Sequence, residues 1–330
     1  MMPSRRRFLR AAAATAAGVA GGHTLAAQTT GARTRTVDTP ALTIAFEERG
    51  EAPAFPIVLL HGFPDDVRAW DDVVPALVEA GYRTIVPYLR GVGPTRFRQP
   101  STMRSGQQAA IGQDLLDLAD ALQLPRFAVA GFDWGNRAAC IAAALHPHRV
   151  RAGVFINGYT IQDTLAPSQP AAPERERALW YQWYFNTERG RLGLQRNRRA
   201  LCRLLWETWS PTWHFAAETF DRTAAAFDNP DFVDVVIHSY RHRNGGPQGD
   251  PRFASMEREL SRRPRIDIPS IVMHGGADGV AGSPPVEAGE RASFSSLSDR
   301  RVIEGAGHFL PRERPAAVSS ALLQLLEQTR

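Results

Sequence analysis

Short apolar runs alternate with segments of helical spacing along most of the chain. The runs lie at residues 55–60, 82–86, 127–130, 154–156, 270–273 and 301–303. Strands that are apolar throughout are typical of a parallel sheet covered by helices on both faces, because neither side of such a strand meets water. The pattern therefore predicts an α/β fold with a mostly parallel sheet.

The segments between these runs carry apolar residues at the spacing of amphipathic helices. The clearest helix is expected at 105–122, and others at 70–78, 136–145, 285–293 and from Pro315 onward. Ahead of the first run, residues 36–50 alternate between polar and apolar side chains. This alternation predicts an opening β-hairpin with a turn at 49–51.

The strand–helix rhythm stops between residues 161 and 262. This stretch has no comparable apolar run and contains five of the seven tryptophans. We therefore expect a helical cap at 161–262, inserted between a first part of the core at 28–160 and a second part at 263–330. A chain of 330 residues with 43 % hydrophobic residues can bury a large core of this kind.

The first residues have the pattern of an export signal. Residues 4–10 contain paired arginines followed by Phe8 and Leu9, and a stretch of small residues with a possible cleavage site comes next. That stretch is too short and too poor in large apolar residues to form a stable membrane anchor. We expect residues 1–27 to be a twin-arginine signal peptide, recognised by the twin-arginine export machinery, which predicts a periplasmic or secreted protein.

The composition excludes several kinds of chemistry. All 39 basic residues are arginine, so Schiff-base catalysis and a phosphate-loop lysine are excluded. Four of the arginines and no carboxylate lie in residues 1–27, so the rest of the chain is close to neutral and predicts no nucleic-acid partner.

The cysteines and histidines predict no metal site. Cys140 lies in an apolar helical pattern that is typical of a buried, inert thiol. Cys202 is far away in the sequence, and the sequence alone does not decide whether the two cysteines form a disulfide. There is no CxxC or HExxH motif. We therefore expect neither a metal nor another cofactor.

The motif GFDWG at residues 131–135 lies between an expected strand and an expected helix. A side chain on such a sharp strand-to-helix turn projects above the sheet, and glycines on either side permit close packing. The start of the helix also stabilises a negative charge. Asp133 could be a helix cap, but this setting favours a nucleophilic carboxylate.

Four further residues complete a candidate catalytic set. His308, in the loop GAGHF at 305–309, is the expected base, and Asp278, after the run at 270–273, is the expected acid that orients it. Asn157 has the rival position for this acid but cannot carry a charge. The backbone N–H groups of Phe63 and Trp134 are the expected oxyanion hole. His61 is expected only to shape its loop.

These motifs resemble the α/β-hydrolase superfamily, and specifically its epoxide hydrolase and haloalkane dehalogenase branch. The resemblance covers nearly all of the expected mature chain and rests on HGFP at 61–64, LRGVG at 89–93, GFDWG at 131–135, HGGAD at 274–278 and GAGHF at 305–309. It implies an α/β-hydrolase fold with a helical cap and an Asp-His-Asp triad.

The resemblance also implies which reaction the cap supports. Two cap tyrosines of epoxide hydrolases hold and protonate the epoxide oxygen, and the matching segments place these roles on Tyr181 and Tyr240. Tyr184 and Tyr159 are the second choices. An alkoxide is a poor leaving group, so ring opening needs an acid of this kind. The expected reaction is hydrolysis of a small, largely apolar epoxide to a vicinal diol through an ester on Asp133.

Two alternatives stay open. A haloalkane dehalogenase would use Trp134 as a halide donor, but Phe63 stands where many dehalogenases have a second donor, an asparagine. The other alternative is a binding protein of the same fold without activity, against which the order of nucleophile, acid and histidine argues.

Overall fold

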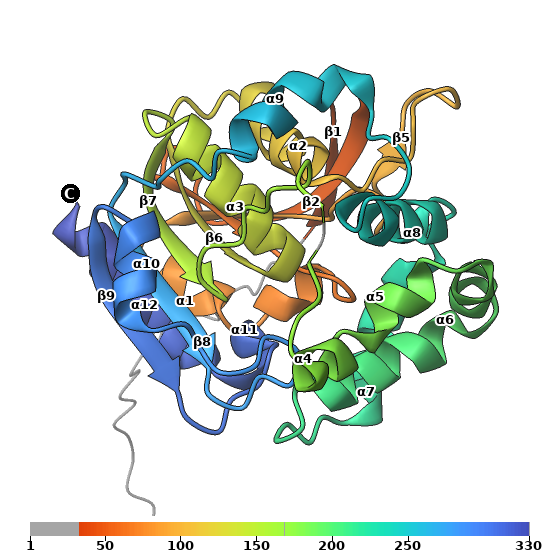
Figure 1. The fold of residues 1–330 in the computed structure, drawn as a ribbon. Coiled ribbons are helices and arrows are strands. Elements are labelled where there is room, and N and C mark those ends of the chain that lie inside the picture. Colours follow the sequence, from red (N-terminus) through yellow and green to blue (C-terminus); the bar gives the residue numbers. More distant parts are fainter. Residues whose placement is uncertain (1–32, 168, 330) are drawn as a thin grey trace, which may run out of the picture. The chain divides into compact units, whose positions relative to one another are not determined.

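The computed structural model describes residues 33–167 and 169–329, and a nine-stranded sheet lies at its centre (Figure 1). The strand order is β1-β2-β4-β3-β6-β7-β8-β9, with β5 paired to β2. In this order, all neighbouring strands from β4 to β9 are parallel. β2 runs antiparallel to both of its neighbours, β1 and β4. The strands are β1 Arg33–Asp38, β2 Leu42–Arg49, β3 Pro56–Leu60, β4 Arg83–Pro87, β5 Arg96–Phe97, β6 Phe127–Phe132, β7 Val150–Ile156, β8 Ser270–Gly275 and β9 Leu297–Ile303.

The expected parallel strands are all confirmed, but the hairpin turn was placed wrongly. β1 and β2 pair through Asp38 and Thr43, so the turn lies between them. At the predicted position, Gly50 ends β2 with φ +93°, a conformation that glycine adopts without strain. β2 then pairs with β4 instead of with the strand that follows it in sequence.

Helices cover both faces of the sheet. α2 and α3 pack against one another on one face, and α3 contacts β3, β6 and β7. α1 and α12 also contact each other, and α12 contacts β7 and β8. These helices, with the two short ones that precede α12, are α1 Val74–Glu79, α2 Gln108–Ala121, α3 Asp133–Leu145, α10 Glu287–Ser293, α11 Leu310–Glu313 and α12 Pro315–Gln328.

The helix expected at 70–78 is shorter than predicted. A 3-10 turn at Val67–Trp70 comes first, and α1 begins only at Val74. Pro75 is the reason, because proline has no backbone N–H to donate and is tolerated only in the first turn of a helix.

Between β7 and β8, the described residues form helices and no strand of the sheet. α5 contacts α6 and α8, and α6 also contacts α7, whereas α9 contacts α2 beside the sheet (Figure 1). These helices are α4 Pro173–Ala178, α5 Trp180–Phe185, α6 Glu188–Trp209, α7 Ala217–Ala224, α8 Phe232–Arg243 and α9 Ala254–Leu260. The division of the chain into core and cap stays a prediction.

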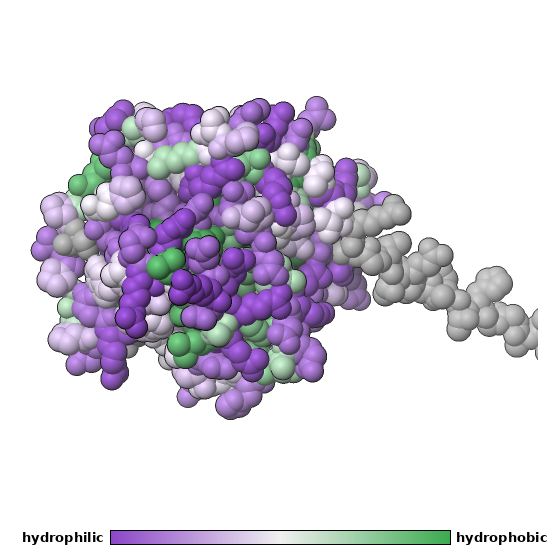
Figure 2. All heavy atoms as spheres, turned by 90° about the vertical axis from the view of Figure 1, so that its right-hand side faces the viewer, coloured by the Kyte–Doolittle hydropathy of each residue, from purple (hydrophilic) through white to green (hydrophobic). Residues whose placement is uncertain are grey.

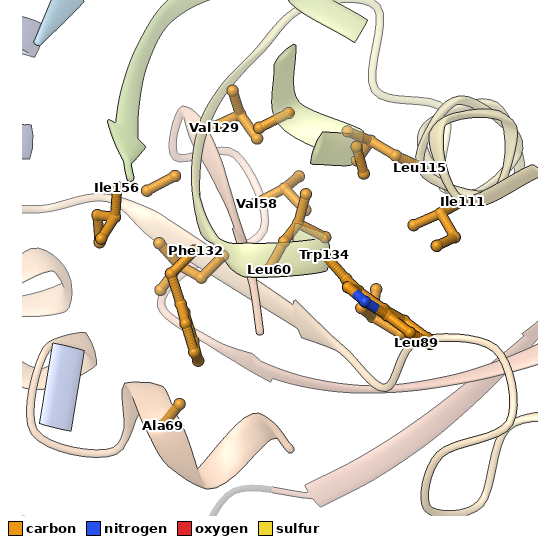
Figure 3. Close-up of a cluster of buried hydrophobic side chains, with 14 of the residues drawn as sticks. Val58, Leu60, Ala69, Leu89, Ile111, Leu115, Val129, Phe132, Trp134 and Ile156 are labelled. Atoms are coloured by element: carbon orange, nitrogen blue, oxygen red, sulfur yellow. The ribbon is translucent and has the colours of Figure 1, made fainter. Parts of the chain in front are cut away.

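Large apolar side chains fill the space between the sheet and these helices. Figure 3 shows part of this core, with side chains of β3 and β6 close to Trp134 and to Leu115 of α2. The helices between β7 and β8 have a mostly hydrophilic outer face (Figure 2). In α6, for example, the apolar residues Leu205, Trp206 and Trp209 are buried. Cys140 and Cys202 are buried and free.

The expected signal peptide at 1–27 lies outside the described residues, so export stays a prediction. Among residues 33–167 and 169–329, no helix combines the length and the apolar character needed to cross a membrane.

Candidate active site

Asp133 lies at the sharp turn where β6 ends and α3 begins. β6 ends at Phe132, and Asp133 has φ +51°, a left-handed conformation that costs free energy in a residue with a side chain. A Cβ on Gly135 would collide with the backbone carbonyls of Leu60 and His61. The tight packing of this glycine against β3 thus holds the turn in its strained form.

The Asp133 carboxylate is held ionised by its neighbours. Its Oδ1 accepts a hydrogen bond from the backbone N–H of Phe63 at 2.9 Å, and the backbone of Trp134 also donates to it. Burial favours the neutral acid, but the nearby charge of His308, together with these two N–H groups, lowers the pKa of Asp133 below its usual value. The two expected oxyanion donors therefore meet at this carboxylate.

His308 lies between two carboxylates. Its Nδ1 is 2.8 Å from Oδ2 of Asp278, and its Nε2 is 3.7 Å from Oδ2 of Asp133. Burial acts to lower the pKa of His308, but the two carboxylates outweigh this effect and raise it to about 10. The side chain of His308 is only 4 % exposed, so this pairing is formed away from bulk water.

Asp278 is fixed in place from three sides. Besides His308, the backbone N–H groups of Val280 and Ala281 donate to its Oδ1 at 2.9 and 2.7 Å. Burial would raise the pKa of Asp278, but the charge of His308 and these hydrogen bonds lower it. Asp278 therefore remains an anion that can orient the imidazole ring.

Asn157, which sequence reasoning considered only as a rival position for the acid, joins the two ends of the site. Its Nδ2 donates to Oδ2 of Asp278 at 3.1 Å, and its Oδ1 accepts the N–H of Asp133 at 3.2 Å. Asn157 has φ +76°, a region that asparagine tolerates better than most residues.

The loop that carries His308 is organised by two residues that the sequence did not reveal. Ser210 Oγ accepts the N–H of His308 at 2.8 Å and donates to Glu313 at 2.6 Å. Glu313 in turn accepts the N–H groups of Gly307 and Phe309. No local signal identifies this pair, because Ser210 and Glu313 lie 103 residues apart in the chain.

Tyr181 of α5 and Tyr240 of α8 lie together. They are 4 % and 1 % exposed, and their ring centroids are 5.3 Å apart at 88°. Burial and the nearby Asp133 charge raise the pKa of Tyr181 to about 12, and burial, Tyr181 and Asp133 raise that of Tyr240 well above its usual value. Both phenols therefore keep their protons over the whole neutral pH range.

The two second-choice tyrosines are placed differently. Tyr159 donates its hydroxyl hydrogen to the carbonyl of Pro264 at 2.7 Å, which ties the group to the backbone. Tyr184 is only partly buried and packs against Trp180.

Aromatic side chains surround the tyrosine pair. Phe63 stacks on Trp134 with ring centroids 5.4 Å apart and also meets the edge of Tyr240 at 5.6 Å. Trp209 lies 4.9 Å from Tyr181 and 5.1 Å from His308. These aromatic rings form an apolar wall beside Asp133 and His308.

His61 has the structural role expected of it. Its Nε2 accepts the N–H of Leu89 at 3.1 Å, and its Nδ1 lies 2.9 Å from the carbonyl of Gly62. Burial lowers the pKa of His61 to about 4, so the ring is neutral and ties the loop after β3 to the loop after β4.

Asp133, His308 and Tyr181 line one cleft of about 650 Å³. Within residues 33–167 and 169–329, no group of three or more histidine, cysteine or acidic side chains is arranged to hold a metal ion. The arrangement as a whole can supply a nucleophile, a base with its orienting acid, and two proton donors.

Comparisons with known proteins agree with this geometry. The family described as alpha/beta hydrolase fold matches residues 56–315. Epoxide hydrolase A of Mycobacterium tuberculosis is 27 % identical over 88 % of this chain and 96 % of its own length. The crystal structure of a candidate epoxide hydrolase from Klebsiella pneumoniae is 39 % identical, with a TM-score of 0.86 over 89 % of this chain and 97 % of its own. The chain thus belongs to the α/β-hydrolase fold family.

Proposed function

We propose that the protein is an epoxide hydrolase, which converts epoxides to vicinal diols through a covalent ester on Asp133. The observation that carries the proposal is the pair of buried, protonated tyrosines, Tyr181 and Tyr240, within electrostatic reach of an ionised carboxylate. The relatives named epoxide hydrolase support the same reaction.

In the first step, Asp133 attacks a ring carbon and the carbon–oxygen bond of the epoxide breaks. Tyr181 and Tyr240 hold the oxygen, and one phenol gives its proton to the alkoxide as it forms. The product of this step is an ester between Asp133 and the opened substrate. Because the pKa of both tyrosines is raised, they are present as acids at any neutral pH.

In the second step, His308 takes a proton from water, and the water oxygen attacks the ester carbonyl. The N–H groups of Phe63 and Trp134 stabilise the negative charge on the carbonyl oxygen. The ester bond to the substrate oxygen then breaks, and His308 gives its proton to that oxygen, which completes the diol. The proton left on the carboxyl group of Asp133 restores the phenol that lost its proton in the first step, so Asp133 is again a carboxylate. Ester formation removes the charge of Asp133, which is one of the two carboxylates that raise the pKa of His308. The pKa of His308 therefore falls when the ester is present, which favours the neutral imidazole that can accept a proton from water.

The substrate is proposed to be small and largely apolar where it contacts the aromatic wall formed by Phe63, Trp134 and Trp209. A panel of styrene-oxide-like, aliphatic and halogenated compounds tests this, with diol and halide measured side by side. Diol from epoxides supports the proposal. Absence of diol from the whole panel, in a folded protein, contradicts it.

Carbon–halogen hydrolysis is the second candidate, and one observation favours it. The indole N–H of Trp134 is buried and has no hydrogen-bond partner among the described residues, so it could donate to a departing halide. Phe63 supplies no second side-chain donor. Halide release from chloro- or bromoalkanes without diol formation from epoxides would establish this alternative.

A further inference from the structure

The cleft beside Asp133 contains arginines that pair with no carboxylate. Four arginines line it, and none forms an ion pair with any residue of the described ranges 33–167 and 169–329. They are Arg137, Arg175, Arg243 and Arg263. The same part of the chain pairs most of its other buried or half-buried arginines with acids, as Arg90 does with Asp114 at 2.7 Å.

The acids of the cleft are occupied by other donors. Asp133 faces His308, and Asp163 accepts the backbone N–H groups of two residues that follow it. Glu176 accepts the indole N–H of Trp183 at 2.7 Å and a backbone N–H. None of these three carboxylates therefore forms an ion pair with an arginine of the cleft.

Arg137 is the most deeply placed of the four. It follows Asp133 by one turn of α3 and is 9 % exposed, and its single hydrogen bond runs from Nη1 to Oε1 of Gln162 at 3.0 Å. Its Nε is buried and has no described partner. A buried guanidinium with an unused donor is costly, because it has lost water without gaining a counter-ion. Burial and the charge of Arg243 lower the pKa of Arg137, which reflects this cost.

Arg243 lies against the tyrosine pair. Its guanidinium stacks on the ring of Tyr240 at 4.5 Å, and Nη2 donates to Ser239 Oγ at 3.1 Å. Its Nε is also buried without a described partner. Its charge acts on Arg137, Tyr181 and Tyr240, so the unpaired guanidinium groups lie close to the place where the epoxide oxygen would be held.

We propose that Arg137 and Arg243 bind an anionic group of the substrate, and that the preferred substrates are small epoxides that carry a carboxylate near the ring. This inference rests on the proposed epoxide hydrolysis and narrows its substrate class. A carboxylate matches the planar fork of a guanidinium and would satisfy the unused Nε donors. The apolar wall would then contact the hydrocarbon part of the same molecule.

The first test compares glycidate with glycidamide, which have nearly the same size but differ in charge. The wild-type protein should hydrolyse glycidate with the higher kcat/KM, and added salt should reduce this preference. Arg137→Gln and Arg243→Gln should each lower kcat/KM for glycidate by about 10- to 100-fold and that for glycidamide by less than about 3-fold. Arg258→Gln, which changes an exposed arginine outside the cleft, is the matched control.

Equal losses for glycidate and glycidamide would overturn the proposal, because they would mean that the arginines act only through Asp133 or through the fold. Arg137→Lys separates the effect of charge from that of hydrogen-bond geometry. It keeps the positive charge but lacks the planar guanidinium that can donate two parallel hydrogen bonds to a carboxylate. Partial recovery for glycidate relative to Arg137→Gln supports direct anion binding. A melting temperature close to that of the wild type shows that each variant is folded.

A second test does not depend on epoxide chemistry. Cyclopropanecarboxylate has the shape of glycidate but no ring oxygen to open, and its binding can be followed by calorimetry. Binding that is lost in Arg137→Gln supports the anion site even if no epoxide is hydrolysed, in which case only the proposed reaction fails. Absence of binding together with hydrolysis of neutral epoxides would overturn the anion site and leave the proposed reaction standing.

Discussion

Asn157 donates a hydrogen bond to the carboxylate of Asp278 at 3.1 Å and so ties Asp278 to the turn that carries Asp133. The two residues follow neighbouring parallel strands, β7 and β8, whose carboxyl ends lie at the same edge of the sheet. Asn157 Oδ1 also accepts the N–H of Asp133. Because the oxygen accepts and the nitrogen donates, an amide suits this position between a backbone N–H and an anion.

The closeness of Asn157 and Asp278 leads to a prediction about the acid. Asp278→Asn should lower kcat for epoxide hydrolysis by roughly 10³- to 10⁴-fold, because His308 loses the anion that orients it. In the double variant Asn157→Asp/Asp278→Asn the anion moves to the neighbouring strand end, and part of the activity should return. Steady-state rates of the three proteins provide the measurement. Full activity of Asp278→Asn would show that another group orients His308.

Variants of the nucleophile and of the base should differ in what accumulates. Asp133→Asn should abolish diol formation, since the amide is not a nucleophile. His308→Gln should still form the ester, but the ester should accumulate because no base activates water. Intact mass measured after mixing with an epoxide should then rise by the mass of the substrate. If the mass of His308→Gln stays unchanged and the epoxide is not consumed, the ester mechanism is contradicted.

Loss of a tyrosine hydroxyl should slow ring opening without removing the aromatic wall. Tyr181→Phe and Tyr240→Phe should each lower kcat by about 10²-fold or more, because the leaving oxygen loses a donor. Tyr184→Phe, from the same helix as Tyr181, is the control and should change kcat little. Single-turnover rates of ester formation locate the effect in the first step. A larger loss in the control than in either variant would reassign the acid to Tyr184.

His308 should make the stability of the protein depend on pH. Its pKa is raised from 6.5 to about 10, so the folded state binds the proton more tightly than the unfolded state does. The stabilisation is therefore full below pH 6.5 and is lost as pH rises towards 10. Urea unfolding measured across this range should show a decline in the free energy of unfolding that is smaller in His308→Gln. Parallel declines in the two proteins would show that other groups cause the dependence.

A buried ion pair joins the loop after β3 to α11. Arg312 bonds Asp65 through Nη2 at 2.5 Å and Nε at 2.9 Å, and it stacks on Trp206. Arg312→Leu should lower the free energy of unfolding by about 3–5 kcal/mol, because Asp65 would be left as an unpaired buried charge. Arg199→Leu, which breaks the exposed pair with Asp228, should cost less than about 1 kcal/mol. Similar costs for the two variants would mean that Asp65 finds another partner.

Local patterns were enough to predict the strands and to single out Asp133, Asp278 and His308, whose side chains the fold brings together. Buried parallel strands are apolar throughout, so six of them could be located from hydropathy alone. The glycines around Asp133 and His308 marked turns where the backbone must pack closely. β9 shows the limit of this prediction, because residues 298–301 of this edge strand are polar and only residues 301–303 were recognised. The hairpin turn failed for a related reason, since alternation does not say where a strand pair reverses.

The amino-acid sequence by itself determined that a carboxylate, a histidine and an acid occur in the order and at the strand ends that an α/β-hydrolase requires. Only the tertiary structure decided that Asn157 links Asp278 to the turn of Asp133, and that Ser210 and Glu313 hold the loop of His308. It alone also decided that Arg137 and Arg243 have no carboxylate partner among the described residues. The physical reason is that a strand can be predicted from the pattern of residues that are neighbours in the sequence. A hydrogen bond or an unpaired charge depends instead on which distant segments the fold brings together.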